Sequence, residues 1–175
     1  MALAIGLTFR VAQYRLLSIV GNMAYSDNML VADVLDVVTA KLPPGWRTST
    51  SRLANRKTAR QDLIDVILKI RPPGASTGTV LIEAKSRLEP RDVDYLAATL
   101  RPTPDEPILI AAPFISPRSR ERLRAKGFAY ADLTGNILLT LSRPGLFIET
   151  TGASENPQPT PRDRKSLKGS KEGIP

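Results

Sequence analysis

The sequence contains neither cysteine nor histidine. Without cysteine the chain can form no disulfide, no thiolate zinc site and no cysteine nucleophile, so nothing points to an oxidising compartment and we expect a cytoplasmic protein. Without histidine it lacks the imidazole that Ser-His-Asp triads, many general bases and most zinc hydrolases use. Any catalysis must therefore depend on carboxylates, lysine, hydroxyl groups or a hard metal ion. Carboxylate sites favour Mg2+ or Mn2+.

Long hydrophobic runs are also missing. No stretch reaches the roughly 20 uninterrupted apolar residues that a membrane span needs. The apolar N-terminus has no basic residue before its apolar part, and Arg10 and Arg15 interrupt it, which is not the pattern of a signal peptide. We expect no membrane association. Residues 1–26 are predicted to form a helical extension that packs on the domain or on a partner subunit, where it would provide the interface of a homodimer.

Acidic residues are fewer than basic ones, with 17 Asp and Glu against 25 Lys and Arg, which gives a net charge of +8. Such a surface attracts polyanions, and nucleic acid is the leading candidate for a partner. The 175 residues, 42% of them hydrophobic, suit one compact domain, which we place at residues 1–150. Residues 151–175 have almost no apolar side chains and are predicted to be a disordered basic tail or a linker.

Apolar spacing and turn residues predict a mixed α/β domain. The first predicted helix begins at Asp27 or Asn28 and ends before Pro43. The later pattern predicts strands at 46–51, 65–70 and 79–85, a helix at 89–100, a strand buried on both faces at 108–114, a helix at 117–126, and strands at 128–133, 136–141 and 146–150.

The strands at 65–70 and 79–85 are joined by a turn rich in proline and glycine and are therefore expected to form an antiparallel hairpin. Side chains alternate between the faces of a strand. In the second strand, Glu83 and Lys85 therefore share one face with Leu81, and the other face carries Val80, Ile82 and Ala84. The apolar face is suited to lie beneath a helix.

Asp65 stands 18 positions before Glu83, at the start of the first strand of this hairpin. Folding the hairpin brings the two carboxylates together, where they repel each other unless a cation lies between them. We expect Mg2+ or Mn2+ bound by Asp65, Glu83 and the Ala84 carbonyl, with Lys85 beside the attacking water. This arrangement suits the hydrolysis of phosphodiesters and needs neither histidine nor cysteine.

The segments "DVILKI" and "VLIEAK" resemble the D-(x)n-E-x-K signature of the PD-(D/E)XK nuclease superfamily, with Ile64 in the place of its proline. The resemblance implies a restriction-endonuclease-like three-layer sandwich, in which helices flank a central mixed sheet. It also implies a metal-dependent DNA endonuclease with metal-binding acids at Asp65 and Glu83 and a catalytic lysine at Lys85. The segment "ISPRSRERLRAKGFAYADLTGN" is similar to the latter half of bacterial nuclease-like proteins, where a basic helix leads to a Tyr-x-Asp-x-x-Gly-Asn strand and turn.

Other assignments remain open at this point. Asp62 competes with Asp65 as the metal ligand, and Asp33 or Asp36 could add a third acid from the first helix. The chain could also be a catalytically inactive nuclease-like module for DNA binding or regulation, or a protein-interaction subunit of a defence or toxin system.

Two groups of basic residues are candidates for contact with duplex or branched DNA. One is a loop that leads into the proposed site, and it contains Arg52, Arg56, Lys57 and Arg60. The other is a stripe at helical spacing formed by Arg118, Arg122 and Lys126.

Overall fold

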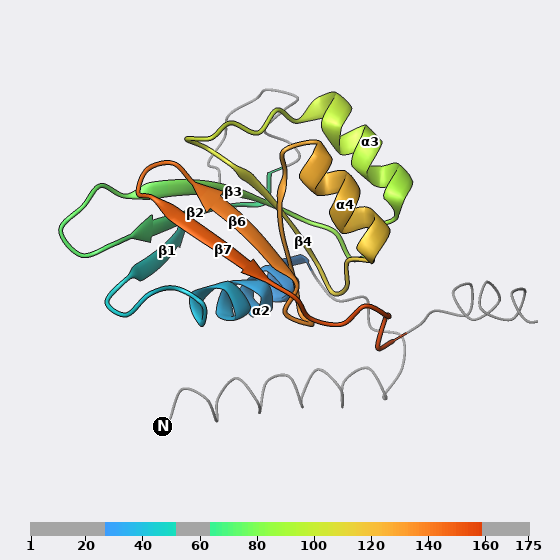
Figure 1. The fold of residues 1–175 in the computed structure, drawn as a ribbon, viewed down its shortest axis with the longest axis horizontal. Coiled ribbons are helices and arrows are strands. Elements are labelled where there is room, and N and C mark those ends of the chain that lie inside the picture. Colours follow the sequence, from blue (N-terminus) through green and yellow to red (C-terminus); the bar gives the residue numbers. More distant parts are fainter. Residues whose placement is uncertain (1–26, 52–63, 159–175) are drawn as a thin grey trace, which may run out of the picture.

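The computed structural model describes residues 27–51 and 64–158, so the helix and the dimer interface predicted for residues 1–26 lie outside the described residues. The described chain has an α/β fold with one seven-stranded sheet, whose strands follow the order β1-β2-β3-β4-β5-β6-β7 (Figure 1). The strands are β1 (Arg47–Ser51), β2 (Val66–Arg71), β3 (Gly78–Ala84), β4 (Ile108–Ala112), β5 (Ala129–Asp132), β6 (Ile137–Leu141) and β7 (Leu146–Thr150). The helices are α2 (Asp27–Thr39), α3 (Pro90–Thr99) and α4 (Pro117–Ala125). Each helix and strand predicted within this part of the chain is present.

The sheet is mixed. β1, β2 and β3 pair antiparallel, which confirms the predicted hairpin, and β5, β6 and β7 pair antiparallel as well. β3, β4 and β5 pair parallel, and the crossovers between them are α3 and α4. Because these three strands run in one direction, their carboxyl ends lie along the same edge of the sheet.

Two hydrophobic cores cover the two faces of the sheet, and together they make three layers. On one face, Leu30, Val31, Val34 and Val38 of α2 pack against a cluster that includes Val80, Ile82 and Ala84. On the other face, Val93 and Leu96 of α3 and Leu123 of α4 pack against a cluster that includes Leu81. The alternation predicted along β3 is therefore confirmed, because its apolar residues lie under α2.

Local sequence signals set the ends of the elements. Glu89 caps α3 in a capping box with Asp92, and Ser116 caps α4 by accepting a hydrogen bond from the Ser119 N–H. β4 ends at Ala112 rather than at the predicted residue 114, because Pro113 has no N–H to continue the ladder. Its carbonyl instead accepts a hydrogen bond from the Leu133 N–H.

Contacts with the domain continue beyond Thr150, although the sequence predicted the domain to end at residue 150. The Gly152 N–H donates to Asn136 Oδ1 at 2.8 Å, and the Ala153 N–H donates to Thr134 Oγ1 at 3.2 Å. A Cβ atom on Gly152 would lie 2.1 Å from the Thr134 carbonyl oxygen, so only glycine fits this contact. Gly152 and Ala153 are thus held by the turn between β5 and β6, and residues 159–175 of the predicted tail lie outside the described residues.

No helix in the described part of the chain is long and apolar enough to cross a membrane.

Candidate metal and phosphodiester site

The three residues predicted to form a site meet at the carboxyl end of β3. Glu83 is in β3, Lys85 follows the strand directly, and Asp65 stands directly before β2. The Asp65 N–H donates to the Ile82 carbonyl at 2.9 Å, and Asp65 Oδ2 accepts a hydrogen bond from the Ala84 N–H at 2.8 Å. These two bonds fix the Asp65 carboxylate against the last residue of β3.

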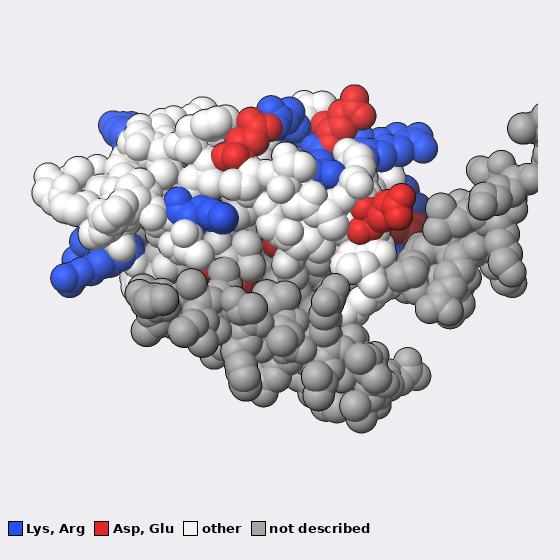
Figure 2. All heavy atoms as spheres, turned by 60° about the horizontal axis from the view of Figure 1, so that its bottom comes forward, with Lys and Arg blue, Asp and Glu red and all other residues white. Residues whose placement is uncertain are grey.

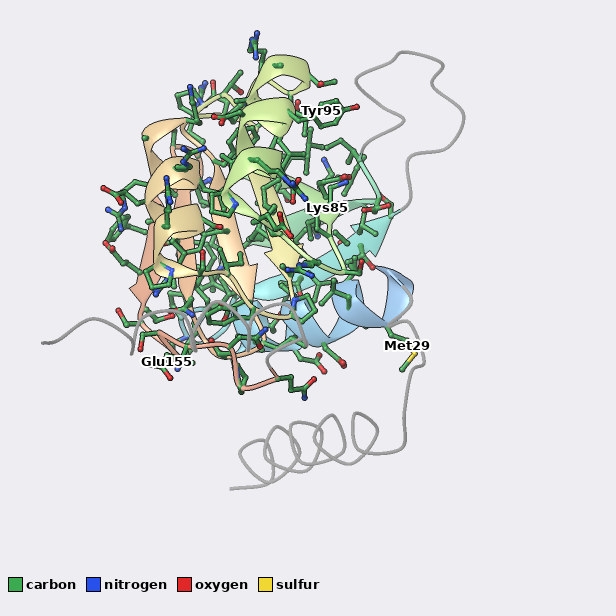
Figure 3. The ribbon with its side chains drawn as sticks, turned by 90° about the vertical axis from the view of Figure 1, so that its right-hand side faces the viewer. Met29, Lys85, Tyr95 and Glu155 are labelled. Atoms are coloured by element: carbon green, nitrogen blue, oxygen red, sulfur yellow. The ribbon has the colours of Figure 1, made fainter. Side chains whose placement is uncertain are left out.

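Lys85 and Glu83 share one face of the strand, as the alternation predicted, and their side chains form an ion pair between Nζ and Oε1. The Lys85 N–H donates to the Ala111 carbonyl at 2.8 Å, which ties its backbone to the neighbouring end of β4. The Glu83 side chain is 4% exposed and the Lys85 side chain 31% exposed. Lys85 therefore reaches from the protein interior toward solvent, as Figure 3 shows.

Burial raises the pKa of Glu83 from its ordinary value of 4.5 to about 7. The ion pair with Lys85 lowers this pKa, whereas the negative charge of Asp65 and a hydrogen bond between the two carboxyl groups raise it. The second pair of effects shows that the Asp65 and Glu83 carboxyl groups lie close together. A cation between them would favour the ionised form of both.

The oxygen atoms at this site suit Mg2+, which binds through one or two carboxylates and keeps several of its waters. Asp65 and Glu83 supply two carboxylates from adjacent segments, and Ala84, whose carbonyl was predicted as a ligand, lies between Glu83 and Lys85 in the chain. The described residues contain no group of three acidic side chains that could hold a metal ion, so neither Asp33 nor Asp36 completes such a set. Asp62, the alternative to Asp65, lies outside the described residues.

The site lies at the edge where β3, β4 and β5 end and where α3 and α4 begin. Ligands of open α/β sheets commonly bind beyond the carboxyl ends of the strands. The first turn of α4 contains no acidic residue, and Arg118 in this turn is exposed. The start of α4 is therefore favourable for an anion, whereas the first turn of α3 carries Asp92.

The basic stripe predicted on α4 is only partly free. Arg118 and Lys126 are exposed, but Arg122 donates to Asp94 Oδ2 at 2.8 Å and to the Pro90 carbonyl at 3.0 Å. Arg122 thus links α4 to α3. The other predicted DNA contacts, Arg52, Arg56, Lys57 and Arg60, lie outside the described residues.

Asp132, in the second segment with a nuclease-like pattern, has a structural role. Its side chain is fully buried and accepts hydrogen bonds from the backbone N–H groups of Ile115, Thr134 and Asn136. The Thr134 hydroxyl and the Asn136 side-chain amide also donate to it. With five donors from the protein, this carboxylate has no free oxygen to offer a metal ion.

Sequence reasoning missed Tyr95, Lys69 and Arg71. Tyr95 is 63% exposed and projects from α3 on the flank that also carries Lys85 (Figure 3). Lys69 and Arg71 occupy alternate positions of β2, on the same face as Ile67, which packs on the α3 and α4 side. The alternation in "VILKIR" would have revealed the two basic residues, whereas nothing local marks Tyr95 as exposed.

Comparison with known proteins found no matching family model, no matching curated protein and no matching solved structure.

Proposed function

We propose that this protein is a metal-dependent DNA endonuclease of the PD-(D/E)XK type with a restriction-endonuclease-like fold. The resemblance in "DVILKI" and "VLIEAK" supports the proposal, and so does a three-layer α/β architecture in which these segments are adjacent antiparallel strands. The net charge of +8 favours a polyanionic substrate.

The observation that carries the proposal is the Glu83 carboxyl group. It is almost fully buried, lies beside a second carboxyl group, and has a pKa near neutrality. Ionising it in the free protein costs free energy. A divalent cation between Glu83 and Asp65 would offset this cost.

In this proposal, Asp65, Glu83 and the Ala84 carbonyl hold Mg2+ or Mn2+. A cation held there would supply Lewis-acid chemistry to the scissile phosphate and would favour deprotonation of the attacking water. Lys85 would orient that water and stabilise the negative charge that develops on the phosphate. Its partly exposed side chain reaches the substrate side of the site.

The direct test is the cleavage of plasmid and branched DNA with Mg2+ or Mn2+. Wild-type protein should nick or cut the DNA only with the metal present, and Glu83→Gln and Lys85→Met should abolish cleavage. Asp105→Asn is the matched control, because it removes one exposed carboxylate far along the chain from the site and should leave cleavage unchanged. If Glu83→Gln and Lys85→Met cleave as well as wild type, the site assignment is wrong.

The second candidate function is DNA binding without catalysis, as in a regulatory module. The closed ion pair between Lys85 and Glu83 favours it, because this pair neutralises the carboxylate without a metal ion. Such a protein would bind DNA equally well with EDTA and would not cleave it. A protein-interaction subunit would instead copurify with an acidic partner and show no affinity for DNA.

A further inference from the structure

The strands β1, β2 and β3 form an antiparallel ribbon at one side of the sheet (Figure 1). One face of the ribbon is apolar and packs toward α2, through Leu68 and Ile70 of β2 and Val80 and Ile82 of β3. The side chains at the alternate positions point to the opposite face. This opposite face, called the ribbon face below, is the one that carries Glu83.

The ribbon face is basic and rich in hydroxyl groups. Ile67 and Leu81 lie on this face next to the site. The other residues of the face are polar or basic: Arg47, Ser49 and Ser51 of β1, Lys69 and Arg71 of β2, Thr79 of β3, and Thr77 just before β3. Glu83 is the one acidic residue among the amino acids of these three strands. Figure 2 is turned toward the α2 side, opposite to the ribbon face, and at the tip of the ribbon it shows Lys and Arg side chains but no Asp or Glu.

Within residues 27–51 and 64–158, the side chains of Lys69 and Arg71 are held by hydroxyl groups of neighbouring threonines. Lys69 Nζ donates to Thr79 Oγ1 at 2.7 Å, and Arg71 Nε donates to Thr77 Oγ1 at 3.1 Å. Arg47 lies directly opposite Arg71 across the ladder. Like charges in opposite positions of a sheet are destabilising, so the free protein carries a repulsion that an anion would relieve.

The ribbon face leads directly to the candidate site. Thr79 and its partner Lys69 lie four residues from Glu83 along β3, a distance of about 13 Å at the usual rise per residue. The row of Arg47 and Arg71 follows about 7 Å further on. The two cationic rows therefore lie in line with the candidate site, about 7 Å apart along the strand direction.

We propose that the ribbon face binds the phosphodiester backbone of the nucleic-acid strand that enters the candidate site, with Lys69, Arg71 and Arg47 as its phosphate contacts. Hydroxyl groups and basic side chains together are the usual partners of backbone phosphates. The inference rests on the proposed function for the identity of the substrate, but it concerns binding rather than cleavage. An acidic protein segment is the competing occupant, and the test separates the two.

The test measures the binding of a fluorescein-labelled DNA duplex by anisotropy across a salt series, in EDTA so that no cleavage occurs. Lys69→Gln and Arg71→Gln should each lower the slope of log affinity against log salt by about 0.9, and at about 0.1 M salt each should weaken binding by about tenfold. Lys41→Gln, which removes the same charge from an exposed position just after α2 on the opposite side of the sheet, should change neither value. Unlabelled polyglutamate should compete far less effectively than unlabelled DNA.

Arg47→Thr gives a second readout that a purely structural role would not produce. It should weaken DNA binding while slightly raising the Tm of the free protein, because it removes the repulsion with Arg71 and leaves the Arg71 contact with Thr77 intact. The inference is overturned if the ribbon variants bind DNA like wild type, if Lys41→Gln weakens binding as much as they do, or if polyglutamate competes as well as DNA. Metal-dependent cleavage with unchanged binding by the ribbon variants would refute this inference alone. If the ribbon variants bind DNA more weakly than wild type but wild type cleaves no DNA, only the proposed nuclease activity is refuted.

Discussion

Glu83 and Asp132 are both buried carboxyl groups at the carboxyl ends of parallel strands, yet their surroundings differ. Asp132 accepts five hydrogen bonds from backbone, hydroxyl and amide donors, so the protein itself satisfies its charge. Glu83 has the Lys85 ammonium on one side and a second carboxyl group on the other, and its pKa rises to about 7. A buried acid that the fold fully satisfies stabilises the structure, whereas one that the fold leaves costly to ionise is suited to bind a cation.

The largest expected difference between the two acids is in cleavage. Glu83→Gln keeps the shape of the side chain but removes a metal ligand, and we expect it to lower the cleavage rate by about 10³-fold. Asp132→Asn, compared at equal concentrations of folded protein, should retain cleavage within a few-fold. A comparable loss of cleavage in both variants would mean that Asp132 also acts in the reaction and is not purely structural.

The free energy of unfolding should show the opposite order, with the larger loss on substitution of Asp132. Asp132→Ala leaves five donors without their acceptor, and we expect it to lower the free energy of unfolding by about 4 kcal/mol. Glu83→Ala removes a partner from Lys85 and from Asp65, but Lys85 can reach solvent and Asp65 keeps the Ala84 N–H, so the loss of stability should be much smaller. Urea denaturation of both variants measures the difference, and equal losses would show that Glu83 is as structural as Asp132.

The raised pKa of Glu83 makes stability depend on pH. Because the folded state binds the proton more tightly than the unfolded state, the contribution of Glu83 is complete below pH 4.5 and is lost as the pH rises toward 7. As the pH rises from 4.5 to 7, the free energy of unfolding of Glu83→Gln, measured relative to that of wild type, should increase by about 3 kcal/mol. Denaturation of both proteins across this range without divalent cations provides the measurement, and a gap that does not change with pH would contradict the raised pKa.

The smallest expected effect is that of the metal on the folded protein. At about pH 8, saturating Mg2+ should stabilise wild type by about 1 to 3 kcal/mol through mass action, which appears as a rise in Tm. Glu83→Gln should show little of this rise, and Asp132→Asn should show all of it despite its lower Tm. An equal rise in all three proteins would place the cation elsewhere.

The sequence was a good guide to the elements and to part of the site. The sequence pattern predicted helices at 89–100 and 117–126, close to the observed α3 and α4, and alternation along β3 placed Glu83 and Lys85 on one face. It was a poor guide to the end of the domain, because the contact of Gly152 with the turn at Thr134 depends on residues far apart in the chain. It also treated the basic residues of α4 as a free stripe, although Arg122 is bound by Asp94 on α3.

By itself, the sequence determined the order of helices and strands, the absence of imidazole and thiol chemistry, and the hairpin that carries Asp65, Glu83 and Lys85. These features follow from side-chain type and periodicity, which act over a few residues. Only the tertiary structure decided that Glu83 is buried beside Asp65, that Asp132 is satisfied by the protein, and that Arg47 lies opposite Arg71. Burial, pKa and pairing depend on which distant segments pack together, and local sequence does not encode that directly.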